Sequence, residues 1–143
     1  MTDVPYRAWR FQHPQLDTGV RPPGLGLEAD GRISMVAGAE SVRQALLLLI
    51  STRPGERVMR PEYGCDLYQL VFSPNDETTH GLAIHLVRQA IDRWEPRIEI
   101  VRLDADRDPD RPDRLLIMLD YRVRATAEAD RLALPLPLTG EGI

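Results

Sequence analysis

Few side chains in the sequence are of the types that catalyse reactions or bind metals, and their spacing favours neither role. The three histidines are His13, His80 and His85. The last two are five residues apart, so they do not share a helical face as a metal-binding pair would. The lone cysteine, Cys65, can form no internal disulfide or thiolate cluster and is typical of a small buried residue. With no phosphate-binding glycine loop or nucleophile elbow either, we expect no catalytic, cofactor-binding or metal-binding residues.

Paired carboxylates are the one enzymatic chemistry that the composition allows. Glu62 could meet Glu95 or Asp66 in a cleft and divide the general acid and base roles of a glycoside hydrolase. However, with 22 acidic residues among 143, some such pair is expected by chance. Aromatic residues, which would stack on a sugar, make up only 6% of the chain. A non-enzymatic role is favoured, with a carbohydrate-cleaving enzyme as the alternative.

Two clusters of charged residues stand at proline-containing corners between predicted elements. One runs from residue 52 to residue 64 and the other from residue 94 to residue 97. Glutamate and arginine at such rigid corners can form charge-assisted hydrogen bonds with a partner protein, or they can pair with each other as internal clamps. Composition alone favours the clamps. The candidate partner-binding residues are Glu56, Arg57, Glu62, Tyr63, Glu95, Pro96 and Arg97.

Charge and hydropathy exclude two classes of partner. The net charge is −4, whereas a nucleic-acid surface would carry clustered excess positive charge. The longest apolar run, Ala45 to Ile50, is six residues, far below the roughly 20 that span a bilayer. The first ten residues contain Asp3, Arg7 and Arg10 and do not resemble a signal peptide. We therefore expect no nucleic acid, no membrane insertion, and synthesis in the cytoplasm.

Hydrophobic periodicity predicts two main helices. Apolar residues at helical spacing indicate one helix over residues 42–50, which must end before Arg53-Pro54. Stricter spacing over residues 79–94, including Leu82, indicates a second helix that starts after the capping residues 73–76. Between them we expect a compact connector over residues 55–72 with a short helical turn at 67–71.

A period of two predicts the strands that follow. Residues 97–103 change parity after Ile100, which indicates either a strand covered on both faces or a β-bulge. A charged loop is expected over residues 104–113, and residues 115–123 alternate cleanly as its antiparallel partner. In residues 132–138 the leucines and prolines occupy opposite parities, which fits only an edge strand.

The N-terminal part carries weaker patterns. Residues 1–24 predict an arm, and Asp30-Gly31 predicts the turn of a short hairpin over residues 25–35. The predicted fold class is α+β, with two main helices packed on an antiparallel sheet of about three strands plus this hairpin. Residues 25–143 are expected to form a single domain.

Three motifs within residues 41–103 resemble the small baseplate wedge, or sheath-initiator, family of contractile phage tails, type VI secretion systems and extracellular contractile injection systems. The matching stretches are a helix ending in Thr52-Arg53-Pro54-Gly55-Glu56-Arg57, then Pro61-Glu62-Tyr63-Gly64 and Phe72, and finally Glu95-Pro96-Arg97. Three motifs in this order make the resemblance specific. The arm up to Pro23 and the loop at 104–114 depart from the pattern.

The resemblance implies a structural role rather than an activity, although members are often called lysozyme-like. It implies six copies around the tail tube, docking on the wedge through Glu95, Pro96 and Arg97, and templating of the first ring of sheath subunits. The implied partners are sheath subunits and baseplate wedge proteins, with tube or spike-hub proteins as further candidates. The chain would assemble in the cytoplasm into a phage tail-like particle. A peptidoglycan-cleaving tail enzyme is the alternative.

Overall fold

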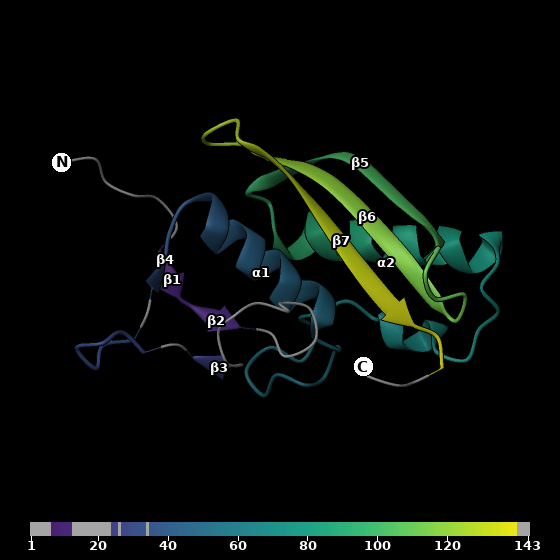
Figure 1. The fold of residues 1–143 in the computed structure, drawn as a ribbon, viewed down its shortest axis with the longest axis horizontal. Helices are drawn as coiled ribbons and strands as arrows, with labels where there is room; N and C mark the ends of the chain where they lie inside the picture. Colours follow the sequence, from purple (N-terminus) through teal and green to yellow (C-terminus); the bar gives the residue numbers. More distant parts are fainter. Residues whose placement is uncertain (1–6, 13–23, 26, 34, 140–143) are drawn as a thin grey trace. The chain divides into compact units, whose positions relative to one another are not determined.

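The computed structural model describes residues 7–12, 24–25, 27–33 and 35–139 of the chain. It divides into two compact units, residues 1–48 and residues 49–143, which are considered separately below (Figure 1). Among the described residues, no helix combines the length and the apolar character that crossing a bilayer requires.

Two pairs of very short antiparallel strands occupy the N-terminal unit. Strand β1 (Ala8–Trp9) pairs with β4 (Met35–Val36), and β2 (Phe11–Gln12) pairs with β3 (Gly24–Leu25). Gln44 joins both segments to the following helix, because its amide accepts from the Phe11 amide at 2.7 Å and donates to the Trp9 carbonyl at 2.7 Å. Strands of two residues are too short to show an alternating pattern, so periodicity could not predict them.

The turn predicted at Asp30-Gly31 is present. Gly31 adopts a φ of +85°, and the Glu28 amide donates to the Arg32 carbonyl at 2.7 Å. Leu27 and Ile33 form a single antiparallel bridge beyond the turn. The segments on either side, β3 and β4, pair with β2 and β1 rather than extending this hairpin.

Both predicted helices are confirmed. Helix α1 (Ala39–Ser51) crosses the division between the units, and its stripe of apolar side chains is buried, including Val42, Leu46 and Leu49. Helix α2 (Glu77–Trp94) begins at Asp76, whose carboxylate accepts a hydrogen bond from the Thr79 amide at 3.0 Å.

The apolar face of α2 is narrower than predicted. It packs against the sheet with Ala83, Val87, Ala90 and Ile91 buried (Figure 1). Leu82, which fits the same helical spacing, lies beside this stripe and is 49% exposed. The prediction that Leu82 belongs to the buried face was therefore wrong. Small residues on the stripe let the helix approach the sheet closely and leave its flanks in solvent.

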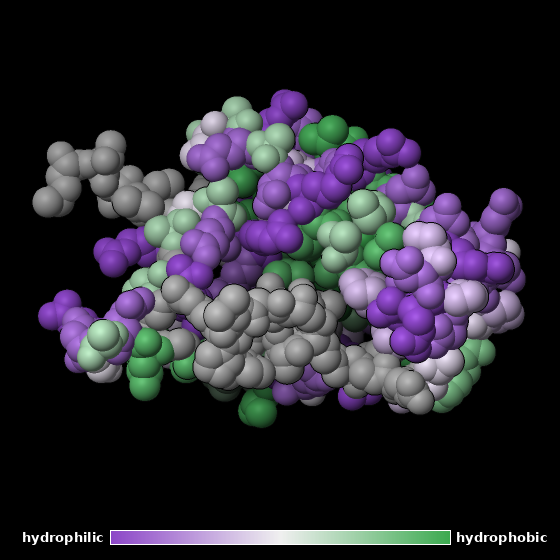
Figure 2. All heavy atoms as spheres, viewed as in Figure 1, coloured by the Kyte–Doolittle hydropathy of each residue, from purple (hydrophilic) through white to green (hydrophobic). Residues whose placement is uncertain are grey.

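Three antiparallel strands form the main sheet, in the order β5-β6-β7. They are β5 (Ile98–Arg107), β6 (Arg114–Val123) and β7 (Ala129–Pro137). The register of β5 shifts between Ile100 and Arg102, which confirms the β-bulge and leaves Val101 57% exposed. Figure 2 shows hydrophilic side chains interspersed with hydrophobic ones over the region of β6 and β7.

The loop between β5 and β6 is shorter than predicted, because β5 continues to Arg107. Asp104 and Asp106 were predicted to lie in the loop. They lie instead on the exposed face of the strand and alternate with the buried residues Leu103 and Ala105. The prediction of a loop was wrong because the alternation of buried and exposed residues continues through these charged positions.

Strand β7 is an edge strand, as predicted. It pairs only with β6, and Leu132, Leu134 and Leu136 are buried while Pro135 and Pro137 interrupt the hydrogen-bond donors of its outer side.

The connector between the helices is tightly folded against the end of α1. The Cys65 amide donates to the Thr52 carbonyl at 2.9 Å, and the predicted helical turn is the 3-10 helix Leu67–Leu70. Cys65 is buried, and burial raises the pKa of its thiol to about 12, so the thiol stays protonated. Gly64, at a φ of +134°, packs so closely that an added Cβ would lie 2.4 Å from the Thr52 carbonyl oxygen.

We predict that Gly64→Ala lowers the free energy of unfolding by about 3 kcal/mol, because backbone strain and a backbone clash add together. Gly55→Ala is the matched control, since Gly55 also has a positive φ of +95° but nothing within 4 Å of its added Cβ. It should cost only about 1 kcal/mol. Chemical denaturation of both variants measures the difference, and equal losses would show that the close approach to Thr52 is absent.

Candidate functional site

The second charged corner forms the junction between α2 and β5. Arg97 donates to both carboxylate oxygens of Glu95, from Nε at 2.6 Å and from Nη2 at 2.8 Å. The Glu95 side chain is only 6% exposed and that of Arg97 is 30% exposed. A two-point, charge-assisted pair of this kind compensates a carboxylate for its burial. Glu95 and Arg97 thus pair with each other, in the geometry of an internal clamp.

Arg124, the residue that follows strand β6, supports the same corner through its backbone and its side chain. The Arg124 amide donates to the Arg97 carbonyl at 2.9 Å. The Arg124 guanidinium donates to the carbonyls of Pro96 at 3.2 Å and Ile98 at 3.1 Å. These bonds satisfy three carbonyls around the proline and fix the direction in which Pro96 is presented to solvent.

The first charged cluster folds onto this corner. The ring of Tyr63 packs edge-on against Trp94, with 5.4 Å between ring centroids and 64° between planes. Glu62 forms an ion pair with Arg93 on the same helical turn as Trp94. Burial raises the pKa of Tyr63, the nearby Glu95 adds to the rise, and Arg57 and Arg97 oppose it. Residues 31 positions apart in the chain are thereby joined in one site.

Arginines cover the exposed sides of the two aromatic rings. The guanidinium carbon of Arg57 lies 4.3 Å from the centre of the Tyr63 ring, and that of Arg93 lies 4.9 Å from the centre of the Trp94 ring. Such cation–π contacts are worth about 0.5–1 kcal/mol each at exposed sites.

Of the seven predicted partner-binding residues, the structure brings six together around this corner, all except Glu56. Glu56 instead pairs with Arg53 at 3.1 Å, and Arg53 lies over the ring of Tyr68. Arg93 and Arg124 also support the site and were not among the predicted residues. The position of Arg93 next to Trp94 was a usable signal, whereas the contact from Arg124 depends on the strand register and left no trace in the sequence.

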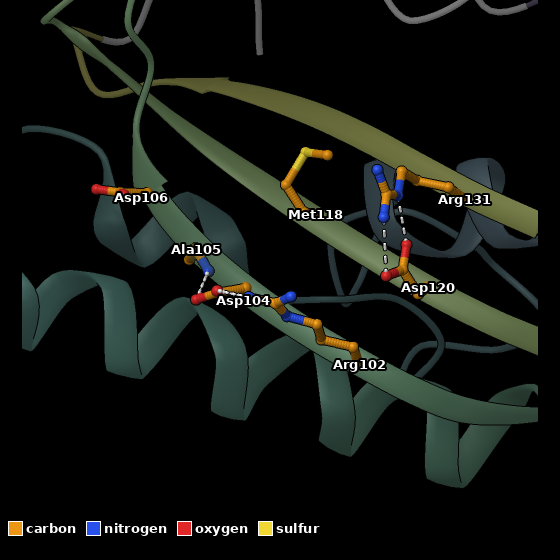
Figure 3. A pocket seen from close by; sticks show the side chains of 7 residues that line it. All are labelled: Arg102, Asp104, Ala105, Asp106, Met118, Asp120 and Arg131. Carbon is orange, nitrogen blue, oxygen red and sulfur yellow. Dashed lines mark hydrogen bonds and ion pairs between the residues drawn. The ribbon is translucent and has the colours of Figure 1, made fainter.

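The geometry does not resemble that of a hydrolase. Of the three carboxylates considered for catalysis, Glu62 and Glu95 both pair with arginines. The hollow in Figure 3 lies elsewhere, on the outer face of the sheet, and is lined mainly by charged residues, among them the ion pairs Arg102–Asp104 and Asp120–Arg131. Asp120 there accepts from Arg131 at 2.6 Å, and this bond lowers the pKa of Asp120. Among the described residues, no three His, Cys, Asp or Glu side chains are grouped so as to hold a metal ion.

The two outer edges of the sheet differ in how far they are closed. On β7, Pro135 and Pro137 lack amide donors, and the Arg131 amide bonds to the side chain of Asp130 at 2.8 Å. On β5 the amides of Ala105 and Arg107 are occupied by aspartates.

Each of these two amides bonds to the side chain of the residue before it. Ala105 donates to Asp104 at 2.9 Å and Arg107 donates to Asp106 at 2.7 Å. Within the described part of the chain, no side chain accepts from the amides of the remainder of β5, residues 98–103, although the Ile98 carbonyl accepts from the Arg124 guanidinium at 3.1 Å. That half of β5 is the open edge of the sheet.

Comparison with known proteins relates these features to a family. The family model for baseplate wedge protein gp25 matches residues 36–128. Baseplate wedge protein gp25 of Enterobacteria phage T4 is 31% identical over 77 residues, which are 54% of this chain and 58% of that protein. The chain thus spans less than two thirds of the length of this relative.

Solved structures share the fold. A protein of Geobacter sulfurreducens assigned as a tail lysozyme is 37% identical, with a TM-score of 0.67 over 74% of this chain and 96% of its own. A chain of the anti-feeding prophage baseplate has a TM-score of 0.67 at 24% identity, covering 82% and 86%. A chain of the type VI secretion baseplate complex has a TM-score of 0.55 at 15% identity, covering 68% and 91%. At these lower identities the likeness concerns the fold.

The family model covers the segment that contains all three motifs, both helices of the site and the strands β5 and β6. It also covers well over half of the 143 residues. The chain therefore belongs to the family of baseplate wedge protein gp25.

Proposed function

We propose that this chain is a structural subunit of the baseplate of a contractile injection system, which docks on the wedge and templates the first ring of sheath subunits. The observation that carries the proposal is the convergence of the family's motifs. Residues from the corner at 52–64 and from Glu95-Pro96-Arg97 meet in one block braced by ion pairs and aromatic contacts. Such a block is rigid, as a docking element must be to lose little entropy on binding.

The proposed wedge-docking surface is the exposed side of this block. Pro96 and Glu62 are exposed, and Arg97 keeps part of its guanidinium side accessible while it pairs with Glu95. A carboxylate or carbonyl oxygen of a partner could accept a hydrogen bond from Arg97 there. It would add to the charge-assisted pair that Arg97 already forms with Glu95. Wedge proteins are the expected partners at this surface, and tube or spike-hub proteins are further candidates.

The proposed sheath-binding surface is the open half of β5. A sheath strand that adds to residues 98–103 would gain main-chain hydrogen bonds, which is the usual source of affinity in strand addition. Proteins close the sheet edges that they do not use. The aspartates on β5 and β7 and the prolines on β7 fit that rule, since they close parts of both outer edges of this sheet. Six copies per particle and assembly in the cytoplasm are part of the same proposal.

A peptidoglycan-cleaving activity is the second candidate, because the Geobacter relative is assigned as a tail lysozyme. The arginine pairs of Glu62 and Glu95 weigh against it. Purified protein incubated with peptidoglycan tests it directly. Turnover that is lost in Glu62→Gln or Glu95→Gln would replace the structural proposal, and the absence of turnover supports it.

We predict that Arg97→Ala abolishes incorporation into baseplates and also lowers the free energy of unfolding by about 2 kcal/mol. The loss of stability is expected because the variant leaves Glu95 buried without its partner. Incorporation is measured by purifying particles from cells that express the variant, and stability by denaturation of the isolated chain. Arg111→Ala is the matched control, since Arg111 also pairs with a carboxylate two residues away, Asp113 at 3.2 Å, but at the other end of β5.

A double variant separates docking from stability. Glu95→Gln with Arg97→Gln removes both charges, so it should recover part of the lost stability and still fail to dock. If it docks as well as the wild type, the pair acts only as an internal clamp and the docking role is refuted.

We predict that the double variant Asp104→Ala with Asp106→Ala increases self-association of the isolated chain, because it frees two amides on the edge of β5. Sedimentation velocity measures the change. The control is Asp92→Ala with Asp110→Ala, which alters the net charge equally at two exposed positions. Equal behaviour of the two double variants would show that the aspartates do not protect the edge.

A further inference from the structure

Two adjacent apolar side chains project into solvent from the connector between the helices. Val58 is 95% exposed and Met59 is 90% exposed, the highest values among the large exposed hydrophobic residues described. Single exposed apolar residues are common on protein surfaces and need no explanation. This pair differs because of how its loop is held and what flanks it.

The loop that carries Val58 and Met59 is fixed by its own backbone. The Gly55 amide donates to the Pro61 carbonyl at 2.6 Å and closes the base of the loop. The Tyr63 amide donates to the Arg60 carbonyl at 3.1 Å, and the next residue, Gly64, packs against Thr52. A loop held in this way presents its tip in one conformation, so insertion of the tip into a partner costs little ordering entropy.

Two arginines flank the apolar pair, and neither has a carboxylate partner among the described residues. Arg57 lies over the ring of Tyr63, and Arg60 lies 6.0 Å from the centre of the Trp94 ring. The neighbouring carboxylates are already engaged, since Glu56 pairs with Arg53 and Glu62 pairs with Arg93. The tip is therefore an apolar knob with a rim of two uncompensated positive charges.

We propose that the tip formed by Val58 and Met59 inserts into an apolar pocket rimmed by carboxylates on another protein of the baseplate. Apolar anchors surrounded by complementary charge are the usual centre of a specific interface. This inference rests on the proposed function and adds a second contact to it, separate from the Glu95–Arg97 corner. Insertion of the tip orients the subunit, because the corner and the tip together define two points of attachment.

A second copy of this chain does not fit the tip as well. Two hollows on residues 49–143 are lined mainly by charged or polar side chains. One lies on the outer sheet face (Figure 3), and the other lies along α2 between His85 and Arg93. Neither of these two hollows is lined by a group of large apolar residues that could receive a valine and a methionine.

The test compares variants for incorporation into purified baseplates. Val58→Ser with Met59→Ser should leave the melting temperature within about 2 °C of the wild type, because exposed side chains contribute little to folding. Incorporation should fall at least about tenfold, which corresponds to about 1.4 kcal/mol of binding free energy. Arg57→Glu with Arg60→Glu should lower it as well, through repulsion from the carboxylate rim. The control variant Leu82→Ser, which changes an exposed hydrophobic residue away from the tip, should be incorporated normally.

Photo-crosslinking identifies the occupant. A benzoyl-phenylalanine in place of Met59 should form an adduct with a different baseplate protein in assembled particles. An adduct with a second copy of this chain, or no adduct in particles that contain the chain, overturns the inference and leaves the proposed function intact. If the wild-type chain enters no baseplate particle, the proposed function itself fails.

Discussion

A buried carboxylate at the junction of a helix and a strand sets the constraint on which the rest of this unit depends. Glu95 caps the C-terminal end of α2 with its side chain almost fully buried. The bidentate hydrogen bond from Arg97, just before β5, compensates the cost of burying this carboxylate. Pro96 between them limits the backbone to a narrow range of directions. Strand β6 then secures the corner through Arg124. The angle between α2 and the sheet is thereby determined by short-range chemistry at three consecutive residues.

Rigidity at this corner extends outward to the surfaces proposed to bind partners. The contact between Trp94 and Tyr63 holds the connector against the end of α2. The connector in turn carries the apolar tip. The bulge in β5 lies a few residues beyond Arg97, and the aspartates beyond the bulge close the rest of the edge. An assembly component gains from this arrangement because binding at one surface does not have to reorganise the others. No cleft with free carboxylates is needed for such a role.

Elements with a local sequence pattern were predicted correctly, whereas those that depend on pairing between distant segments of the chain were not. Helical spacing identified α1 and α2, the change of parity at Ile100 identified the bulge, and the proline parity identified β7 as an edge. The two-residue strands of the N-terminal unit have no periodicity to read. Arg124 reaches the corner only through the register of β6, and the contact between Tyr63 and Trp94 depends on how the connector folds. The family resemblance assigned a docking role to Glu95, Pro96 and Arg97, which stays a prediction, whereas composition alone favoured the internal clamp that the geometry of Glu95 and Arg97 displays.

A structure of the assembled baseplate by electron microscopy, with this subunit located in the map, tests the central claim most directly. The account predicts that the block around Glu95 and Arg97 contacts a wedge protein and that a sheath strand runs antiparallel or parallel to residues 98–103 of β5. A map in which the corner faces no neighbouring subunit, or in which the sheath strand pairs along the proline side of β7, would contradict it.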